Sequence, residues 1–356
     1  MNSIKIPNYG DTNFITGMRA WAALITVLIH TGGAGLRGLG PIGNYVADLG
    51  RTGVYTFFVI SGFCVAQSFF HSKSYKNYFS KRYHRIAPLY FFWLTICGIR
   101  IYASTGLESF DFLDIFLRYS FLGFFNYKIQ SNGWIGVEWS LPIEMFWYVF
   151  VPPLMLLCNT VKKAVVLVLF SLPVILALKS TLNHILKDTG VDVGNFYHWS
   201  PIPYFFSFSL GILAFNIRQS LSKFFIDKKY IINLNFFALA VYILLASYSI
   251  KVQRYEFFII SIFTFLVLSF GSHTNIILKT LFIPKPIQVI GVLSYGIYLC
   301  HIQVMGMWNN FSSLIPNPTV KFLIVAAGSI FVSFLTYKVI EQEKYKSIFK
   351  IKTLNN

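Results

Sequence analysis

Two ionisable side chains lie at the two ends of one apolar stretch near the N-terminus. In RAWAALITVLIH, residues 19–30, Arg19 begins the stretch and His30 ends it. Each residue turns an α-helix by about 100°, so these two side chains point within about 20° of each other and lie about 16 Å apart along the axis. A neutral histidine inside a cavity can take a proton from a hydroxyl near neutral pH, which is the task of a general base.

The same pair has a simpler interpretation, in which both groups only mark the ends of a membrane span. Arginine side chains reach back to the headgroups, and amphipathic rings collect at the interface. Ionisable residues inside spans usually face a bundle interior or a cavity, however, and a purely interfacial pair has no reason to share a face. We therefore expect His30 and Arg19 in a catalytic site, with Arg19 placed to organise a donor or to pair with a carboxylate such as Glu144.

A carboxylate lies inside another apolar stretch, WSLPIEMFWY, which places Glu144 several residues into a span. A lone carboxylate at that depth is costly, so a cation or a polar pocket must accompany it. It fits a structural ion pair with an arginine of another helix as well as it fits a catalytic role. We include Glu144 among the candidate catalytic residues and leave both interpretations open.

A basic cluster, KRYHRIAPLY, precedes the third span. A positive anchor on the cytoplasmic side accounts for its charge. Such an anchor does not explain the spacing of Arg82 and Arg85, which places both residues on one face of a helix. Two guanidinium forks on one face suit a ligand that carries phosphate groups.

Two further motifs combine small or hydroxylated residues with aromatic ones inside spans. GVYTFFVISGF contains Ser61, and LSYGIYLCH contains Tyr295, Tyr298 and His301. Close helix packing explains the first motif equally well, and anchoring by interfacial aromatic residues explains most of the second. From these motifs we expect Ser61 and Tyr298 to contribute to the binding of the donor.

The composition identifies the class of protein. The chain has 356 residues, of which 55% are hydrophobic, 19% aromatic and only 12% charged, as expected for a polytopic membrane protein. The net charge of +17 comes from short clusters between apolar runs, which argues against nucleic acid as a partner. The four cysteines form no CxxC pair and the histidines show no metal-ligand spacing, so we expect neither a disulfide framework nor a metal site.

Stretches of about 17 to 25 apolar residues predict an all-α integral membrane bundle of about ten transmembrane helices. The expected spans are 14–32, 53–71, 86–104, 134–158, 164–180, 201–218, 231–250, 256–270, 287–310 and 320–340. Residues 111–127 form an amphipathic segment that suits the membrane interface. We expect one domain over residues 1–356, with a cytoplasmic segment at 1–13 and a basic cytoplasmic tail at 341–356.

These motifs, in this order, resemble the acyltransferase-3 family of bacterial integral membrane O-acyltransferases. The resemblance covers nearly the whole chain and rests on Arg19 and His30, GVYTFFVISGF, RYHRIAP, WSLPIEMFWY and LSYGIYLCH. The chain departs from the family at Thr16, where an acidic residue is common, and at Met145, where a second carboxylate is frequent. Its ending, IEQE, lacks the proline of the family's I-E-x-P.

The resemblance implies an enzyme of the bacterial cytoplasmic (inner) membrane that O-acetylates surface polysaccharides such as O-antigen, capsule or exopolysaccharide. Acetyl-CoA, or another acyl-CoA, would donate the acyl group from the cytoplasm to a hydroxyl of the glycan or of its lipid-linked precursor. Arg82 and Arg85 would hold the CoA phosphates while the pantetheine arm enters the bundle toward His30. Whether His30 then acts as a base or is transiently acylated stays open.

A transporter or flippase of a polar or glycolipid substrate is the alternative, because buried Arg, His and Glu also suit a substrate pathway. The sequence shows no inverted repeat and no matched pair of broken helices, which argues against it. A non-catalytic scaffold does not account for charged groups that align within spans.

We predict that the segment from Lys73 to Arg85 and the tail at 341–356 both face the cytoplasm, because cations are concentrated there. A reporter that is active on only one side of the membrane, fused after Ser74 or at the C-terminus, should report the cytoplasm in both positions. A fusion within 311–319, which carries no charge, should report the opposite side. The reverse result at either of the first two positions would refute the topology.

Overall fold

The structure is a computed structural model that describes residues 12–106, 111–187, 189–221, 256–271, 276–311 and 317–341. These residues form helices and contain no strands. The helices are α1 (Phe14–His30), α2 (Pro41–Asp48), α3 (Gly53–Phe70), α4 (Tyr75–Thr105), α5 (Phe112–Tyr119), α6 (Tyr127–Ser131), α7 (Ser140–Leu157), α8 (Val161–Ile185), α9 (Val193–His198), α10 (Phe205–Leu221), α12 (Glu256–Phe270), α13 (Ile276–Phe282), α14 (Lys285–Asn309) and α15 (Pro318–Thr336). A π-helical turn, Tyr337–Glu341, extends α15.

Six helical segments are long and apolar enough to cross a membrane, and they confirm the predicted all-α membrane class. They are Pro41–Phe70, Tyr75–Thr105, Ser140–Leu157, Val161–Ile185, Lys285–Asn309 and Pro318–Glu341. Phe14–His30 and Phe257–Phe270 are shorter apolar helices. The expected span at 231–250 lies outside the described residues.

Two helices start away from the predicted span boundaries, and the predicted amphipathic segment is only partly α-helical. The helix that contains the span predicted at 86–104 starts at Tyr75, because the Ser74 side chain accepts a hydrogen bond from the Asn77 N–H and caps it. The helix expected from residue 134 starts at Ser140, because Gly136 has a φ of 92°, which no helix allows. The amphipathic segment 111–127 is α-helical over Phe112–Tyr119 and continues through a short 3-10 helix, Gly123–Phe125, to the start of α6.

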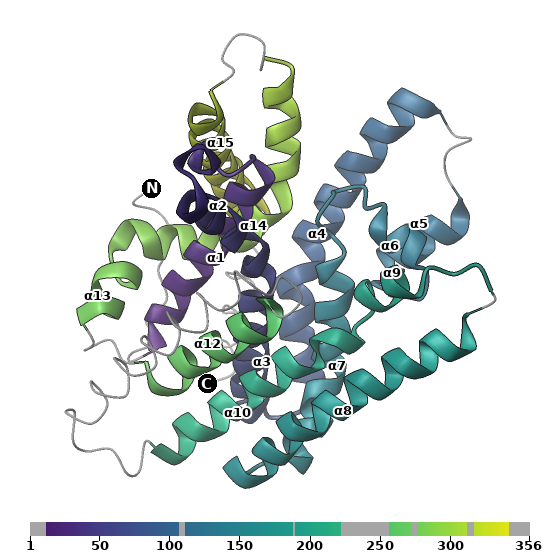
Figure 1. The fold of residues 1–356 in the computed structure, drawn as a ribbon, viewed down its shortest axis with the longest axis vertical. Coiled ribbons are helices and arrows are strands. Elements are labelled where there is room, and N and C mark those ends of the chain that lie inside the picture. The colour runs from purple at the N-terminus through teal and green to yellow at the C-terminus, as the bar shows by residue number, and fades with distance from the viewer. Residues whose placement is uncertain are drawn as a thin grey trace, which may run out of the picture.

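Helices from distant parts of the sequence lie side by side. α14 packs between α1 and α15, and α3 packs against α10, α12 and α7 (Figure 1). The first helix, α1, therefore packs against one of the last, α14. Helices from the middle and later parts of the chain pack on α3. This arrangement brings the first and last predicted motifs together.

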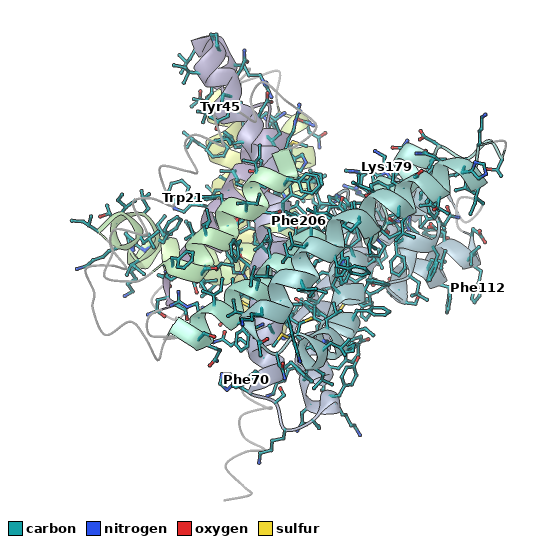
Figure 2. The ribbon with its side chains drawn as sticks, turned by 60° about the horizontal axis from the view of Figure 1, so that its bottom comes forward. Trp21, Tyr45, Phe70, Phe112, Lys179 and Phe206 are labelled. Carbon is teal, nitrogen blue, oxygen red and sulfur yellow. The ribbon has the colours of Figure 1, made fainter. Side chains whose placement is uncertain are left out.

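The outward faces of the bundle are apolar. On α8, Val166, Leu169 and Leu176 are each more than 60% exposed, and Phe70 and Phe112 project outward from other parts of the molecule (Figure 2). Side chains of this kind are stable at such exposure in lipid rather than in water. The chain is a multi-pass membrane protein.

Two glycines allow α3 and α10 to approach closely. A Cβ atom at Gly62 would lie 2.6 Å from the Phe208 carbonyl oxygen, and one at Gly211 would lie 2.4 Å from the Val59 carbonyl oxygen. Backbone atoms cannot yield as a flexible side chain can, so each position requires glycine. Small residues at helix contacts are typical of membrane bundles.

We predict that Gly211→Ala destabilises the protein by about 1–3 kcal/mol, because the added methyl group forces α3 and α10 apart. The change should appear as a lower melting temperature of the detergent-solubilised protein. Gly306→Ala is the matched control, since Gly306 lies in α14 with nothing within 4 Å of an added Cβ. Equal melting temperatures for the two variants would contradict the close contact.

Candidate active site

His30 lies against a second histidine that the sequence places 271 residues away. His30 is the last residue of α1, and its Nδ1 atom lies 2.7 Å from Nε2 of His301 in α14. The two rings are nearly parallel, with centroids 4.9 Å apart. His301 is fully buried, whereas His30 is exposed on its other side. The pair thus has one buried member and one that a substrate can reach.

A close contact between α1 and α14 makes this pair possible. A Cβ atom at Gly291 would lie 2.0 Å from the Thr16 carbonyl oxygen, so the two backbones touch near the start of α1. Further along α14, the Tyr298 hydroxyl donates to the Val137 carbonyl oxygen at 2.9 Å and also lies 2.9 Å from the Ser140 hydroxyl. Tyr298, predicted to bind the donor, therefore lies beside His301 with its hydroxyl already engaged.

The turn segment 132–139 holds α14 on the other side of this site. Gln303 donates to the Ile135 carbonyl oxygen at 3.0 Å, and Arg118 forms a buried ion pair with Glu138. The Ile135 N–H also donates to Glu138 at 2.6 Å. Burial raises the pKa of the Glu138 carboxyl, while Arg118 and the Ile135 N–H act in the opposite direction. These contacts fix the segment that Tyr298 binds.

Glu144 lies in a polar cluster and not in an ion pair. Its carboxylate accepts hydrogen bonds from the Ser61 hydroxyl of α3 and, at 2.5 Å, from the Tyr148 hydroxyl. The ion pairs among the described residues do not include Glu144. The structural ion pair, one of the two interpretations left open, is therefore not formed among the described residues, and a polar pocket accompanies the carboxylate instead. The structure brings the predicted Ser61 and Glu144 into direct contact.

A second carboxylate, Glu341, interacts with two of the predicted arginines, Arg85 and Arg19. Arg85 of α4 forms an ion pair with Glu341 at 3.1 Å, and Arg19 lies within electrostatic reach of the same carboxylate. The Nε atom of Arg19 is buried and has no hydrogen-bond partner. Sequence reasoning noted Glu341 only as part of the IEQE ending. The carboxylate near Arg19 is therefore one that no local pattern singles out.

Arg82 is bound less completely than Arg85. Its Nη2 atom donates to the Cys64 carbonyl oxygen at 3.3 Å, and its buried Nε atom has no hydrogen-bond partner. Glu144 and Arg82 both lie within electrostatic reach of Tyr148. Arg82 therefore belongs to the cluster around Glu144 and keeps an unused donor, whereas the Arg85 guanidinium is engaged by Glu341.

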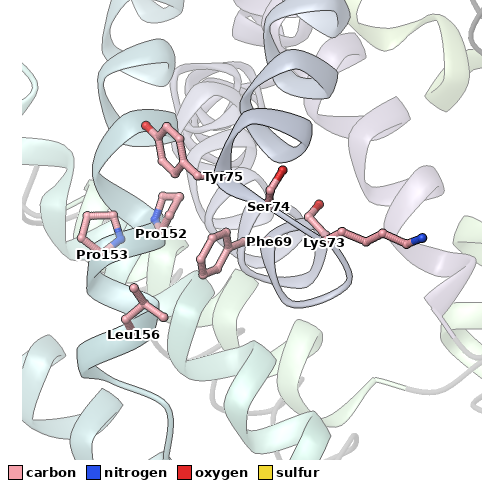
Figure 3. Close-up of a pocket in the computed structure, with 8 residues that line it drawn as sticks. Phe69, Lys73, Ser74, Tyr75, Pro152, Pro153 and Leu156 are labelled. Carbon is pink, nitrogen blue, oxygen red and sulfur yellow. The ribbon is translucent and has the colours of Figure 1, made fainter.

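A hollow of about 360 Å³ lies at the C-terminal ends of α3 and α7 and the start of α4. Phe69, Lys73, Tyr75 and Pro152 are among its lining residues (Figure 3). The Tyr78 ring lies 5.6 Å from Phe69 and 6.0 Å from Tyr75, and Glu144 is within its electrostatic reach. Tyr78 therefore packs against two residues that line the hollow, Phe69 and Tyr75.

The site thus has two levels along the bundle. One level holds Arg19, Arg82 and Arg85 with their partners, and the other holds His30 and His301. The described part of the chain contains no group of three or more His, Cys, Asp or Glu residues that could hold a metal ion. The sequence missed His301, which was grouped with interfacial aromatics, although its place in LSYGIYLCH inside a span was a usable signal.

A helical membrane bundle with a pair of histidines, one of them buried, and with partly buried arginines belongs to the class of membrane proteins that carry ionisable groups within their spans. The family model described as an acyltransferase domain matches residues 12–338, so the chain belongs to this acyltransferase-3 family and is a membrane O-acyltransferase. The resemblance of the motifs is confirmed.

Two curated relatives extend the comparison. Nodulation protein 10 of Rhizobium leguminosarum bv. viciae is 26% identical over 331 residues, which cover 85% of each chain. O-acetyltransferase OatA of Staphylococcus aureus is 23% identical over 366 residues, which cover 94% of this chain and 57% of OatA. The chain therefore spans little more than half of that second relative. No solved structure matches the chain significantly.

We predict that Arg85→Ala lowers the free energy of unfolding by about 1–3 kcal/mol, because it leaves the buried Glu341 carboxylate without its ion-pair partner. The measurement is the melting temperature of the solubilised protein. Adding Glu341→Gln to Arg85→Ala should restore part of the loss, because the stranded charge is removed.

Arg37→Ala is the control for this comparison. Arg37 pairs with Asp48 at 2.7 Å, but its side chain is 41% exposed, so its removal should change stability by less than about 1 kcal/mol. If the melting temperature of Arg85→Ala equals that of Arg37→Ala, the ion pair with Glu341 does not support the fold.

Proposed function

We propose that this protein transfers an acetyl group from cytoplasmic acetyl-CoA to a hydroxyl of a cell-surface glycan or of its lipid-linked precursor, in the bacterial cytoplasmic (inner) membrane. The observation that carries the proposal is the pair of His30 and His301, which gives a membrane acyltransferase one accessible imidazole held by a buried partner. The name of the relative OatA, an O-acetyltransferase, supports acetyl as the transferred group.

The arginine level supports CoA as the donor. Arg82 has a buried Nε atom without a partner, and a phosphate oxygen is the acceptor that such a guanidinium binds best. Arg85 already binds Glu341, so we assign it a supporting part in holding the phosphates. Lys73 and the basic residues that follow it add positive charge at the same end of the bundle. The thioester end of the donor would then extend toward His30.

At His30 the chemistry is the transfer of an acyl group from the thioester sulfur of the donor to the hydroxyl oxygen of the acceptor. The acceptor hydroxyl gives its proton to the imidazole as its oxygen bonds to the thioester carbonyl carbon, and the carbon–sulfur bond breaks. The CoA thiolate leaves and takes up the proton, so the products are an acetyl ester and free CoA. A route through a transiently acylated His30 also requires an unprotonated ring nitrogen. Membership in the acyltransferase family favours this chemistry over transport alone.

We predict that His30→Gln lowers acetyl transfer by about 10²- to 10⁴-fold while acetyl-CoA still binds, because only proton transfer is lost.

Arg82→Ala should instead mainly raise the KM for acetyl-CoA, and Arg82→Lys should recover part of the loss without the bidentate fork. The assay uses purified protein in lipid vesicles with radiolabelled acetyl-CoA and a lipid-linked glycan fraction from the source cells.

Several outcomes would count against the proposal. If the wild-type protein transfers no label to glycan, the donor or the acceptor class is wrong. Turnover close to normal in His30→Gln would reduce His30 to an interfacial anchor. Unchanged acetyl-CoA binding in a folded Arg82→Ala protein would remove Arg82 from the donor site. Comparing surface glycans by mass spectrometry, with and without the gene, would identify the acceptor.

A further inference from the structure

The hydrogen bonds of His301 determine which of its ring nitrogens carries the proton. Its Nδ1 atom lies 2.7 Å from the Tyr298 carbonyl oxygen and 3.3 Å from the Ile297 carbonyl oxygen. A backbone carbonyl accepts hydrogen bonds and cannot donate one. The His301 Nδ1 atom must therefore carry hydrogen, because a lone pair there would face two carbonyl oxygens.

The other nitrogen of His301 then acts as an acceptor. His301 is fully buried, and no carboxylate pairs with it among the described residues. An imidazolium buried without a counter-ion is costly, so His301 is neutral. A neutral imidazole with hydrogen on Nδ1 has its lone pair on Nε2.

That lone pair points at His30. The His301 Nε2 atom lies 2.7 Å from the His30 Nδ1 atom, a distance at which one hydrogen must lie between the two nitrogens. Since His301 Nε2 carries none, the His30 Nδ1–H is the donor. Neutral His30 therefore keeps its own lone pair on Nε2. The same contact survives when His30 is protonated, because Nδ1–H is present in both forms.

We propose that His301 is a positioning residue that holds His30 in the tautomer whose Nε2 lone pair faces the substrate. The catalytic use of this lone pair rests on the proposed function, whereas the tautomer itself does not. During transfer the hydroxyl proton moves to His30 Nε2, the new ester bond forms, the carbon–sulfur bond breaks, and the proton passes on to the CoA thiolate. Nδ1–H remains bonded to His301 throughout and stabilises the charged ring.

Three variants separate this role from packing. His301→Phe keeps a flat ring of similar size but removes the acceptor for His30. His301→Gln places an amide oxygen near the position of Nε2 and keeps an acceptor. His184→Phe, at the exposed end of α8, makes the same substitution away from the pair and is the matched control.

The direct test is solid-state NMR of protein labelled with ¹⁵N-histidine in lipid bilayers. The His30 signals are assigned by their loss in His30→Gln. Wild-type His30 should show a protonated Nδ1 and an unprotonated Nε2, and this preference should be lost in His301→Phe and kept in His301→Gln and His184→Phe. Hydrogen on Nε2 of neutral wild-type His30, or no change in His301→Phe, would overturn the proposal.

The kinetic test uses the same proteins. His301→Phe should lower kcat by about 10²-fold or more with little change in the KM for acetyl-CoA, and His301→Gln should recover at least about 10-fold of that loss. Equal activities of the Phe and Gln variants, at equal melting temperatures, would show that the acceptor atom does not matter. An inactive wild-type protein would refute the proposed function, and the NMR result would still decide the tautomer.

Discussion

A hydrocarbon core offers no water to a polar side chain, so each ionisable group within a span needs a partner that the protein itself supplies. In this bundle the partners come from other helices: His30 binds His301, Arg85 binds Glu341, and Glu144 binds Ser61. Each pair joins two helices at a defined rotation. The same contacts that make the polar groups tolerable therefore also align the spans that build the site.

Close backbone contact is the second condition on which these pairs depend. Short side chains such as Ser61 reach a partner only if the two helices nearly touch. Gly291 allows this between α14 and α1, and Gly62 and Gly211 allow it between α3 and α10. The glycines act at a distance from the polar pairs, but they set the spacing of the helices that carry them.

Under the proposed function, the arginine level would bind the donor and the histidine level would carry out the transfer. The arginine level lies at the basic end of the bundle, which is where the proposed function places the charged donor. The histidine level lies about 16 Å further along α1, as the helical rise requires.

The sequence by itself determined the features that depend on neighbouring residues. Hydropathy located the spans, and helical periodicity placed Arg19 and His30 on one face, because both signals are local. Only the tertiary structure decided which groups meet. His301 lies 271 residues from His30, and Glu341 lies 256 residues from Arg85. Such contacts depend on how each helix is rotated and which helix lies beside it, and no local pattern carries that information.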